Sequence, residues 1–130
     1  MFDKQTKLTW ARCSVGQQWC FKKGCKGNPK GFTFATAQKL TTAYRRVPTK
    51  DELDTLFSAF DAPVKIDTAI FPMRAGSNGQ HLYWSSEQFD DSSAWYADFN
   101  LGATDHIFGD YSFLNEKFFV RLVKVDRVNP

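Results

Sequence analysis

The sequence has few of the features that mark nucleotide-binding, hydrolytic or membrane-spanning proteins. It contains two histidines and three cysteines in 130 residues. It has no run of about eighteen apolar residues, the length that a bilayer requires. Neither of the glycine motifs that cradle phosphates, G-x-x-x-x-G-K-[ST] and G-x-G-x-x-G, is present. We therefore expect a protein that does not insert into a membrane and does not bind nucleotides.

The two histidines give little support for a hydrolase. A catalytic triad needs a Ser or Cys nucleophile beside a histidine that a carboxylate holds. His81 and His106 are the only candidates, and neither lies in a nucleophile motif. We interpret both as loop histidines that are exposed or hydrogen-bonded, and we expect no enzymatic activity.

Metal binding and a leader segment also lack support. Four aspartates in two predicted loops offer oxygen ligands for calcium, but without EF-hand spacing, so solvated aspartates are the favoured interpretation: Asp90, Asp91, Asp105 and Asp110. We expect no metal and no cofactor. The start, MFDKQTKLTW, has no apolar signal-peptide core. Either the protein stays inside the cell, or an export signal lies elsewhere.

The three cysteines lie together in the segment CSVGQQWCFKKGC. They are seven and five positions apart, whereas zinc ligands usually come in pairs separated by two to four residues. A disulfide is the favoured prediction. Pairing Cys13 with Cys25 closes a loop rich in Gly and Lys and leaves Cys20 odd, while the other pairings stay open.

Aromatic residues are what the sequence has in abundance. They make up 16% of the chain, with thirteen Phe, and 42% of all residues are hydrophobic. A chain of this size is about one compact domain, which we place over residues 1–130. Its core should be built from rings, and some rings should remain on the surface as contact groups.

Charge is divided unevenly along the chain. Residues 1–50 carry eleven Lys and Arg against one Asp, a net +10, whereas residues 51–130 carry six against thirteen acidic residues, a net −7. The favoured interpretation is that the halves attract each other in the fold. The alternative is that a basic face is presented to an anionic partner.

The basic half contains one loop that mixes rings with cations. In residues 13–31, Trp19 and Phe21 precede three lysines, and a fourth lysine follows: Lys22, Lys23, Lys26 and Lys30. Such a mixture suits anionic sugars or single-stranded nucleic acid. The acidic second half disfavours nucleic acid. The alternative is a solubilising loop tied by a disulfide.

Hydrophobic periodicity predicts two helices in the first half. The first begins after Thr33 and places Phe34, Ala37, Leu40 and Tyr44 near one stripe. The second begins at a capping box of Thr49 and Glu52, and its buried face runs Leu53, Leu56, Phe57 and Phe60 before Pro63 ends it. A long connection, residues 61–80, follows; Ile66, Ile70 and Phe71 are its expected anchors.

Strands are predicted at 7–12, 82–85, 95–99, 103–108 and 118–125. Trp84, Trp95, Ala97 and Phe99 should face the core, and NLG at 100–102 should be a turn. Residues 87–93, EQFDDSS, should form a loop in which Phe89 has no core role. The last strand is apolar on both sides and should be central, pairing with the first. This order of elements predicts an α+β domain.

Six segments in this order resemble one bacterial family: LTWARC, RRVPTKDEL, IDTAIFP, YWSS, AWYADFNLG and FFVRLVK. They are similar to the C-terminal domain of the Legionella collagen-like adhesin, over roughly residues 3–125. That family is related to the formylglycine-generating sulfatase-modifying proteins. It implies a C-type lectin-like fold with two helices, a twisted antiparallel sheet and long irregular loops.

The resemblance also implies a function and a location. It favours an extracellular, cell-surface or periplasmic recognition or adhesion domain that binds an anionic polysaccharide, such as a sulfated glycan, or a protein partner. A homo-oligomer is an option that the resemblance raises. The sequence lacks the calcium-binding tripeptides of true C-type lectins, the collagen-like stalk, and cysteines in the enzymes' active-site positions. The alternatives are an assembly module of a bacterial or phage appendage and, less favoured, a sulfatase-modifying-type enzyme.

These arguments define two sets of candidate ligand-binding residues. The first is the basic loop with Lys22, Lys23, Lys26 and Lys30. The second is a more neutral face with Gln88, Phe89, Asp90, Asp91, His106, Phe108 and Tyr111. Phe89 is the first side chain that we would truncate.

Overall fold

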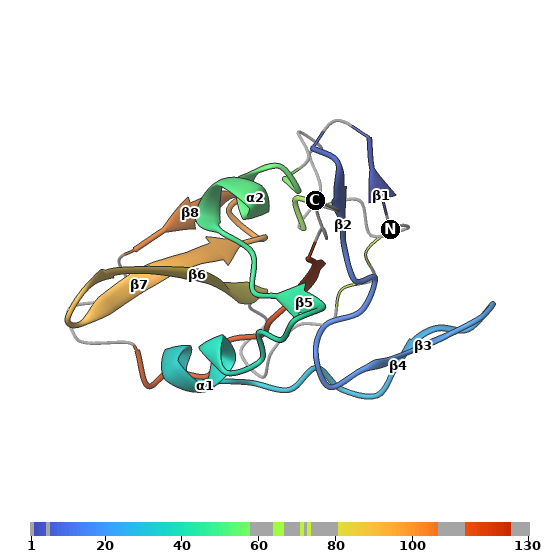
Figure 1. Cartoon of the computed structure of the whole chain (residues 1–130), viewed down its shortest axis with the longest axis horizontal. Helices are drawn as coiled ribbons and strands as arrows, with labels where there is room; N and C mark the ends of the chain where they lie inside the picture. The colour runs from blue at the N-terminus through green and yellow to red at the C-terminus, as the bar shows by residue number, and fades with distance from the viewer. Residues whose placement is uncertain are drawn as a thin grey trace.

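The computed structural model describes residues 2–4, 6–57, 64–66, 71, 73, 81–106 and 114–125. Among these residues the elements are β1 (Phe2–Asp3), β2 (Leu8–Thr9), β3 (Gln18–Cys20), β4 (Gly24–Lys26), α1 (Phe34–Gln38), β5 (Arg45–Arg46), α2 (Lys50–Asp54), β6 (Leu82–Asp90), β7 (Ser93–Asp98), β8 (Ala103–Asp105) and β9 (Val123–Lys124). The named strands pair antiparallel, which confirms the α+β class (Figure 1). They form several small sheets rather than one twisted sheet, and the C-type lectin fold stays a prediction.

The helix α1 is shorter than its stripe predicted. Thr33 caps it, since its side-chain oxygen accepts the backbone N–H of Thr36 at 3.4 Å. The helix ends at Gln38, so Tyr44 does not continue its buried face and is 63% exposed. The reason is the Thr42 side chain, which accepts the N–H groups of Tyr44 and Arg45 and turns the chain into β5.

The helix α2 begins with the predicted capping box. The Thr49 hydroxyl accepts the Glu52 N–H at 3.2 Å, and the Glu52 carboxylate accepts the Thr49 N–H at 2.8 Å. Leu53 and Leu56 are buried as expected, but the helix itself ends at Asp54. Phe60 and Pro63 lie outside the described residues. The guanidinium of Arg46 donates to both Glu52 oxygens at 2.6 Å, which ties β5 to α2.

This cap makes the stability of the fold depend on pH. Burial raises the pKa of Glu52, but hydrogen bonds from Arg46 and Thr49 outweigh it, so the pKa lies below its ordinary value of 4.5. A lowered carboxyl pKa stabilises the fold above the unfolded pKa, and the contribution is lost as pH falls through the folded pKa. We expect Glu52→Gln to cost about 1 kcal/mol near neutral pH. Urea unfolding at several pH values should show this cost shrinking below about pH 4.5; a cost that is the same in acid would contradict the assignment.

The long hairpin β6–β7 corrects the predicted loop at residues 87–93. Strand β6 continues to Asp90, with irregular register after Trp84, and only Asp91 and Ser92 form the turn before β7. The Asp90 carboxylate closes this turn by accepting the Ser92 N–H at 2.9 Å and the Ser93 hydroxyl at 2.7 Å. The polar stretch is therefore mostly strand, exposed where the hairpin extends beyond the core.

Strand β7 has buried residues on both faces, which the sequence did not predict. Ala97 and Phe99 are buried as expected, but Tyr96, which alternates with them and so points to the opposite face, is also buried. Trp95 is only half-buried, because its ring packs against Phe89 and His106 on the other side of the strand from the buried Ala94. The turn between β7 and β8 is confirmed at residues 99–102, where Gly102 has a φ of +82°.

The final segment, residues 118–124, is central, as predicted. Phe118 exchanges backbone hydrogen bonds with Phe32, and Phe119 lies in a parallel bridge with Tyr83. Val123 is opposite Trp10 on one side and Arg46 on the other. The N-terminal and C-terminal segments are therefore neighbours, although the regular strand β9 covers two residues only.

This segment contributes residues to two buried clusters. The first includes Phe34, Trp84, Tyr96 and Phe118, and the second includes Trp10, Leu53, Tyr83, Phe99 and Val123. Trp84 is the centre of the first: its ring stacks on Phe118 at 4.4 Å between centroids, and its indole N–H donates to the Phe32 carbonyl at 2.7 Å. The core is built from rings, as the composition predicted.

Candidate functional site

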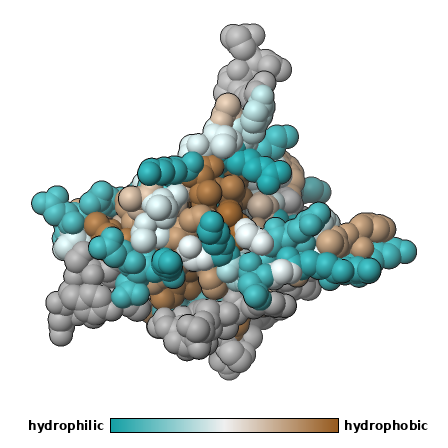
Figure 2. Space-filling view, turned by 90° about the horizontal axis from the view of Figure 1, so that it is seen from below, coloured by the Kyte–Doolittle hydropathy of each residue, from teal (hydrophilic) through white to brown (hydrophobic). Residues whose placement is uncertain are grey.

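The predicted basic loop forms a hairpin that projects from the body of the molecule (Figure 1). We call residues 18–26, strands β3 and β4 with their turn, the basic hairpin. Lys22 and Gly24 have φ values of +65° and +80°, which reverse the chain at the tip. In Figure 2 the projection at the right is largely hydrophilic, with hydrophobic residues along it. Phe21 is 82% exposed and Trp19 is 42% exposed, so both rings of the basic hairpin are accessible to solvent.

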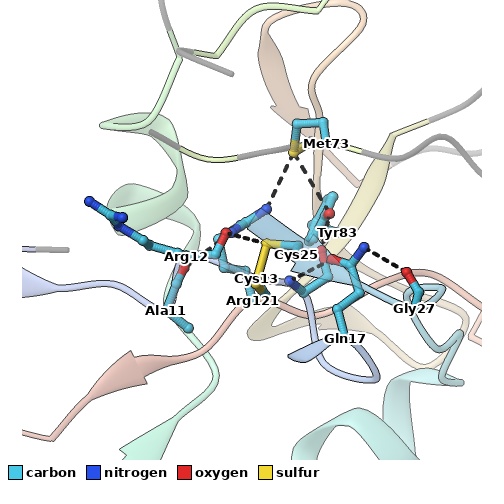
Figure 3. The surroundings of a disulfide bond; sticks show 10 residues. Ala11, Arg12, Cys13, Gln17, Cys25, Gly27, Met73, Tyr83 and Arg121 are labelled. Atoms are coloured by element: carbon cyan, nitrogen blue, oxygen red, sulfur yellow. Dashed lines mark hydrogen bonds between the residues drawn. A yellow bond between two sulfur atoms is a disulfide. The ribbon is translucent and has the colours of Figure 1, made fainter. Parts of the chain in front are cut away.

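A disulfide holds the base of the basic hairpin (Figure 3). Cys13 is bonded to Cys25, the pairing that closes the Gly- and Lys-rich loop, and Cys20 is free. Gln17 adds a second tie: its side chain accepts the Ser14 N–H at 3.2 Å and donates to the Gly27 carbonyl at 3.1 Å. The hairpin is thereby fixed at its base while its tip extends into solvent.

Beneath this base lies a buried arginine (Figure 3). Arg121 donates to the carbonyls of Ala11 and Arg12, next to the disulfide, and its guanidinium lies 5.7 Å from the centre of the Tyr83 ring. Burial lowers the pKa of Arg121. The Tyr83 hydroxyl is also hydrogen-bonded to Ser14. These contacts connect the hairpin base to the second core cluster, so the hairpin has a rigid support.

The four predicted lysines do not form one cluster. Lys22 and Lys23 are at the tip and Lys26 is on β4, all exposed. Lys30 lies past the hairpin, with its ammonium 5.5 Å from the centre of the Phe32 ring. The ion pairs seen in the described part of the chain are Arg46–Glu52 and Lys50–Asp51, and they involve none of the four.

The second predicted face contains a cluster of rings near the turn of the β6–β7 hairpin. We call Phe89, Trp95 and His106 the aromatic platform. Phe89 and His106 stack with centroids 3.7 Å apart, and Trp95 meets His106 edge-on at 4.6 Å. The Lys50 ammonium lies 4.6 Å from the centre of the Trp95 ring. Phe89 is 51% exposed, which leaves much of its ring open to a partner.

The other predicted residues of this face have local roles or lie outside the description. Gln88 donates to the backbone carbonyl of Asp90 at 2.7 Å. Hydrogen bonds from Ser93 and Ser92 lower the pKa of Asp90, which is engaged in its own turn. Asp91 is exposed in that turn. Phe108 and Tyr111 fall outside the described residues, as does Asp110.

Sequence reasoning missed two members of these surfaces. Arg12 lies with its guanidinium 4.6 Å from the centre of the Trp19 ring, and Lys50 covers Trp95. A pairing between an arginine before Cys13 and a ring in β3 has no periodic signal, because the disulfide brings the two segments together. His81 was interpreted correctly as hydrogen-bonded: its ring lies 3.2 Å from the Asn100 side-chain oxygen.

Neither a metal centre nor a membrane-spanning helix is found among the described residues. They contain no group of three or more His, Cys, Asp and Glu side chains arranged to hold a metal ion. They also contain no helix with the length and apolar character needed to cross a membrane.

The fold and the site define a small α+β domain with a basic hairpin that a disulfide ties to its body. The family model of the Lcl C-terminal domain matches residues 1–124, and the chain belongs to this bacterial surface-associated family. The match confirms the resemblance carried by the six sequence segments. No curated protein and no solved structure matches the chain.

Proposed function

We propose that this chain is a non-enzymatic recognition domain of the bacterial cell surface, and that it binds an anionic polysaccharide through the basic hairpin. The observation that carries the proposal is the projection of three lysines and two exposed rings on one supported element. Residues 5–50 contain ten Lys and Arg and no acidic residue, so no carboxylate of this segment competes with a ligand for the lysines. The rings offer faces on which sugars stack.

A polymer suits this surface better than a single small anion. Each exposed lysine contributes about 1 kcal/mol or less to an ionic contact, because water screens the charge. A chain with repeated sulfate or carboxylate groups engages several lysines at once, and the contacts add through high effective concentration. The aromatic platform gives the same polysaccharide, or a protein partner, a second and less charged contact. A disulfide and the family membership support a location outside the cytoplasm.

Replacing Lys22, Lys23 and Lys26 together by Gln should weaken heparin binding about tenfold or more, since three contacts of about 0.5 kcal/mol each account for that factor. Isothermal titration at about 0.15 M salt measures the change. The matched control replaces three exposed lysines outside the hairpin, Lys4, Lys39 and Lys117, and removes the same net charge.

The control should lose much less affinity than the hairpin variant. Equal losses in both variants would mean that net charge, and not the hairpin, governs binding. A Phe89→Ala variant separates the two surfaces: its heparin affinity should fall less than that of the hairpin variant. An unaltered affinity in the hairpin variant would overturn the proposal.

A further inference from the structure

Three short segments far apart in the sequence make a second surface beside the base of the basic hairpin. Trp10, which follows β2, is opposite Val123, and β5 pairs with the other edge of β9, with Arg45 opposite Lys124. Side chains alternate between the two faces of extended strands. Trp10 and Val123 point into the second core cluster, so their neighbours Ala11, Leu122 and Lys124 belong to the opposite, outer face with Arg45. Leu122 is partly buried there and also packs against the first core cluster.

This outer face is hollowed. One depression of about 510 Å³ is lined by residues 11–17 together with Trp19, Arg45 and Leu122. A second, of about 360 Å³, is lined by residues 9–11 with Tyr44, Arg45, Leu122 and Lys124. Because Ala11, Arg45 and Leu122 line both, the two depressions form one groove that runs from the hairpin base across β9 to Tyr44. Each part is as large as ordinary small-ligand sites, which occupy roughly 300–1,000 Å³.

The groove is lined by positively charged side chains. Arg12, Arg45 and Lys124 line it, and none of the described lining residues is acidic. Arg45 and Lys124 lie directly opposite each other in the β5–β9 pair, so their side chains emerge on the same face. Like charges in directly opposed positions destabilise a sheet. Neither residue belongs to the ion pairs of the described chain. A bound anion would remove this repulsion.

Aromatic rings border both ends of the groove. Tyr44 lies at one end and is 63% exposed, and Trp19 lies at the other with Arg12 against its ring. Planar guanidinium groups bind carboxylate and sulfate oxygens in pairs, and rings stack on the apolar face of a sugar. The guanidinium groups of the groove can bind the acidic group of a sugar while the rings at its ends stack on the sugar itself. The groove therefore fits one unit of an acidic sugar chain.

We propose that this groove binds a sugar ring that carries a carboxylate or sulfate group, with the anion between Arg45 and Lys124 and the ring against Tyr44. This inference rests on the proposed function and gives it a defined pocket. The basic hairpin then holds the polymer by many screened contacts, and the groove recognises one acidic unit of it.

Three small probes test the groove by NMR titration: methyl glucuronide, glucose 6-sulfate and the neutral methyl glucoside. The protein should bind one or both anionic probes and not the neutral one, and the stronger anionic probe identifies carboxylate or sulfate as the recognised group. Replacing both Arg45 and Lys124 by Gln should lower the affinity for that probe at least about tenfold, because two charge contacts are lost. The matched control, Lys39→Gln with Lys117→Gln, also removes two charges, both outside the lining, and should leave the affinity unchanged.

The melting temperature gives an independent readout. Because the double variant removes a like-charge pair, its melting temperature should equal or exceed that of the parent protein, so weaker binding cannot be assigned to unfolding. If the neutral probe bound as tightly as the anionic probes, or if the double variant kept full affinity, the assignment of the groove as the binding site would be wrong.

Heparin binding keeps the two proposals apart. If the parent protein binds heparin but neither anionic probe, the groove assignment is wrong and the hairpin function stands. If it binds an anionic probe but not heparin, the hairpin function is wrong and the groove stands.

Discussion

Trp84→Ala should lower the free energy of unfolding by about 3–5 kcal/mol, the cost of removing a large buried ring from a packed core. The side chain is fully buried, stacks on Phe118 and meets Phe34 edge-on. Its loss also leaves the Phe32 carbonyl without the indole donor at 2.7 Å. Because small domains are stable by only about 5–15 kcal/mol, the variant should be partly unfolded in mild denaturant.

Urea unfolding measures this difference, and the chain offers a control of the same residue type. Trp19 is partly exposed on the basic hairpin and contacts Arg12. Trp19→Ala should cost no more than about 1 kcal/mol, the value of an exposed cation–ring contact. Similar losses in both variants would mean that Trp84 is not the centre of the first core cluster.

Replacing both Cys13 and Cys25 by Ser should cost about 3 kcal/mol of stability. The two cysteines are separated by 12 residues, and a cross-link over a loop of this size restricts the unfolded chain by about that amount. The disulfide also fixes the hairpin base above Arg121. The double variant should therefore bind heparin more weakly as well, because a free hairpin loses more conformational entropy on binding.

The third cysteine supplies the control for this pair. Cys20 is a free thiol at the end of β3, and Cys20→Ser should leave both the unfolding curve and heparin binding unchanged. Full stability in the Cys13→Ser/Cys25→Ser protein would contradict the structural role of the disulfide. A large loss in Cys20→Ser would indicate that the thiol pairs differently in solution.

The parts of the fold that the sequence predicts best are those set by local chemistry. The capping box at Thr49, the buried stripe of Leu53 and Leu56, and the turn before Gly102 each depend on residues within a few positions of one another. Both helices are shorter than predicted, because the periodic apolar residues continue past the end of each helix. A threonine side chain bonds to the backbone near each end, Thr42 after α1 and Thr55 after α2.

The candidate site was predictable only in part. The basic hairpin follows from its composition, since rings and lysines are adjacent in the chain. The extension of β6 does not, because residues 87–93 are largely polar and strand period alone cannot locate the turn at Asp91. The groove was missed because the opposition of Arg45 and Lys124 joins segments far apart in the sequence. No local pattern encodes that pairing.

The central claim is that exposed lysines on a supported hairpin bind an anionic polysaccharide. Its most direct test is titration of the unaltered protein with heparin and with chemically desulfated heparin, between about 0.05 M and about 0.15 M salt. We expect heparin to bind, its affinity to fall steeply as salt screens the lysines, and desulfated heparin to bind much more weakly. Equal affinity for both polymers, or heparin affinity that is constant across this range, would contradict the proposed function.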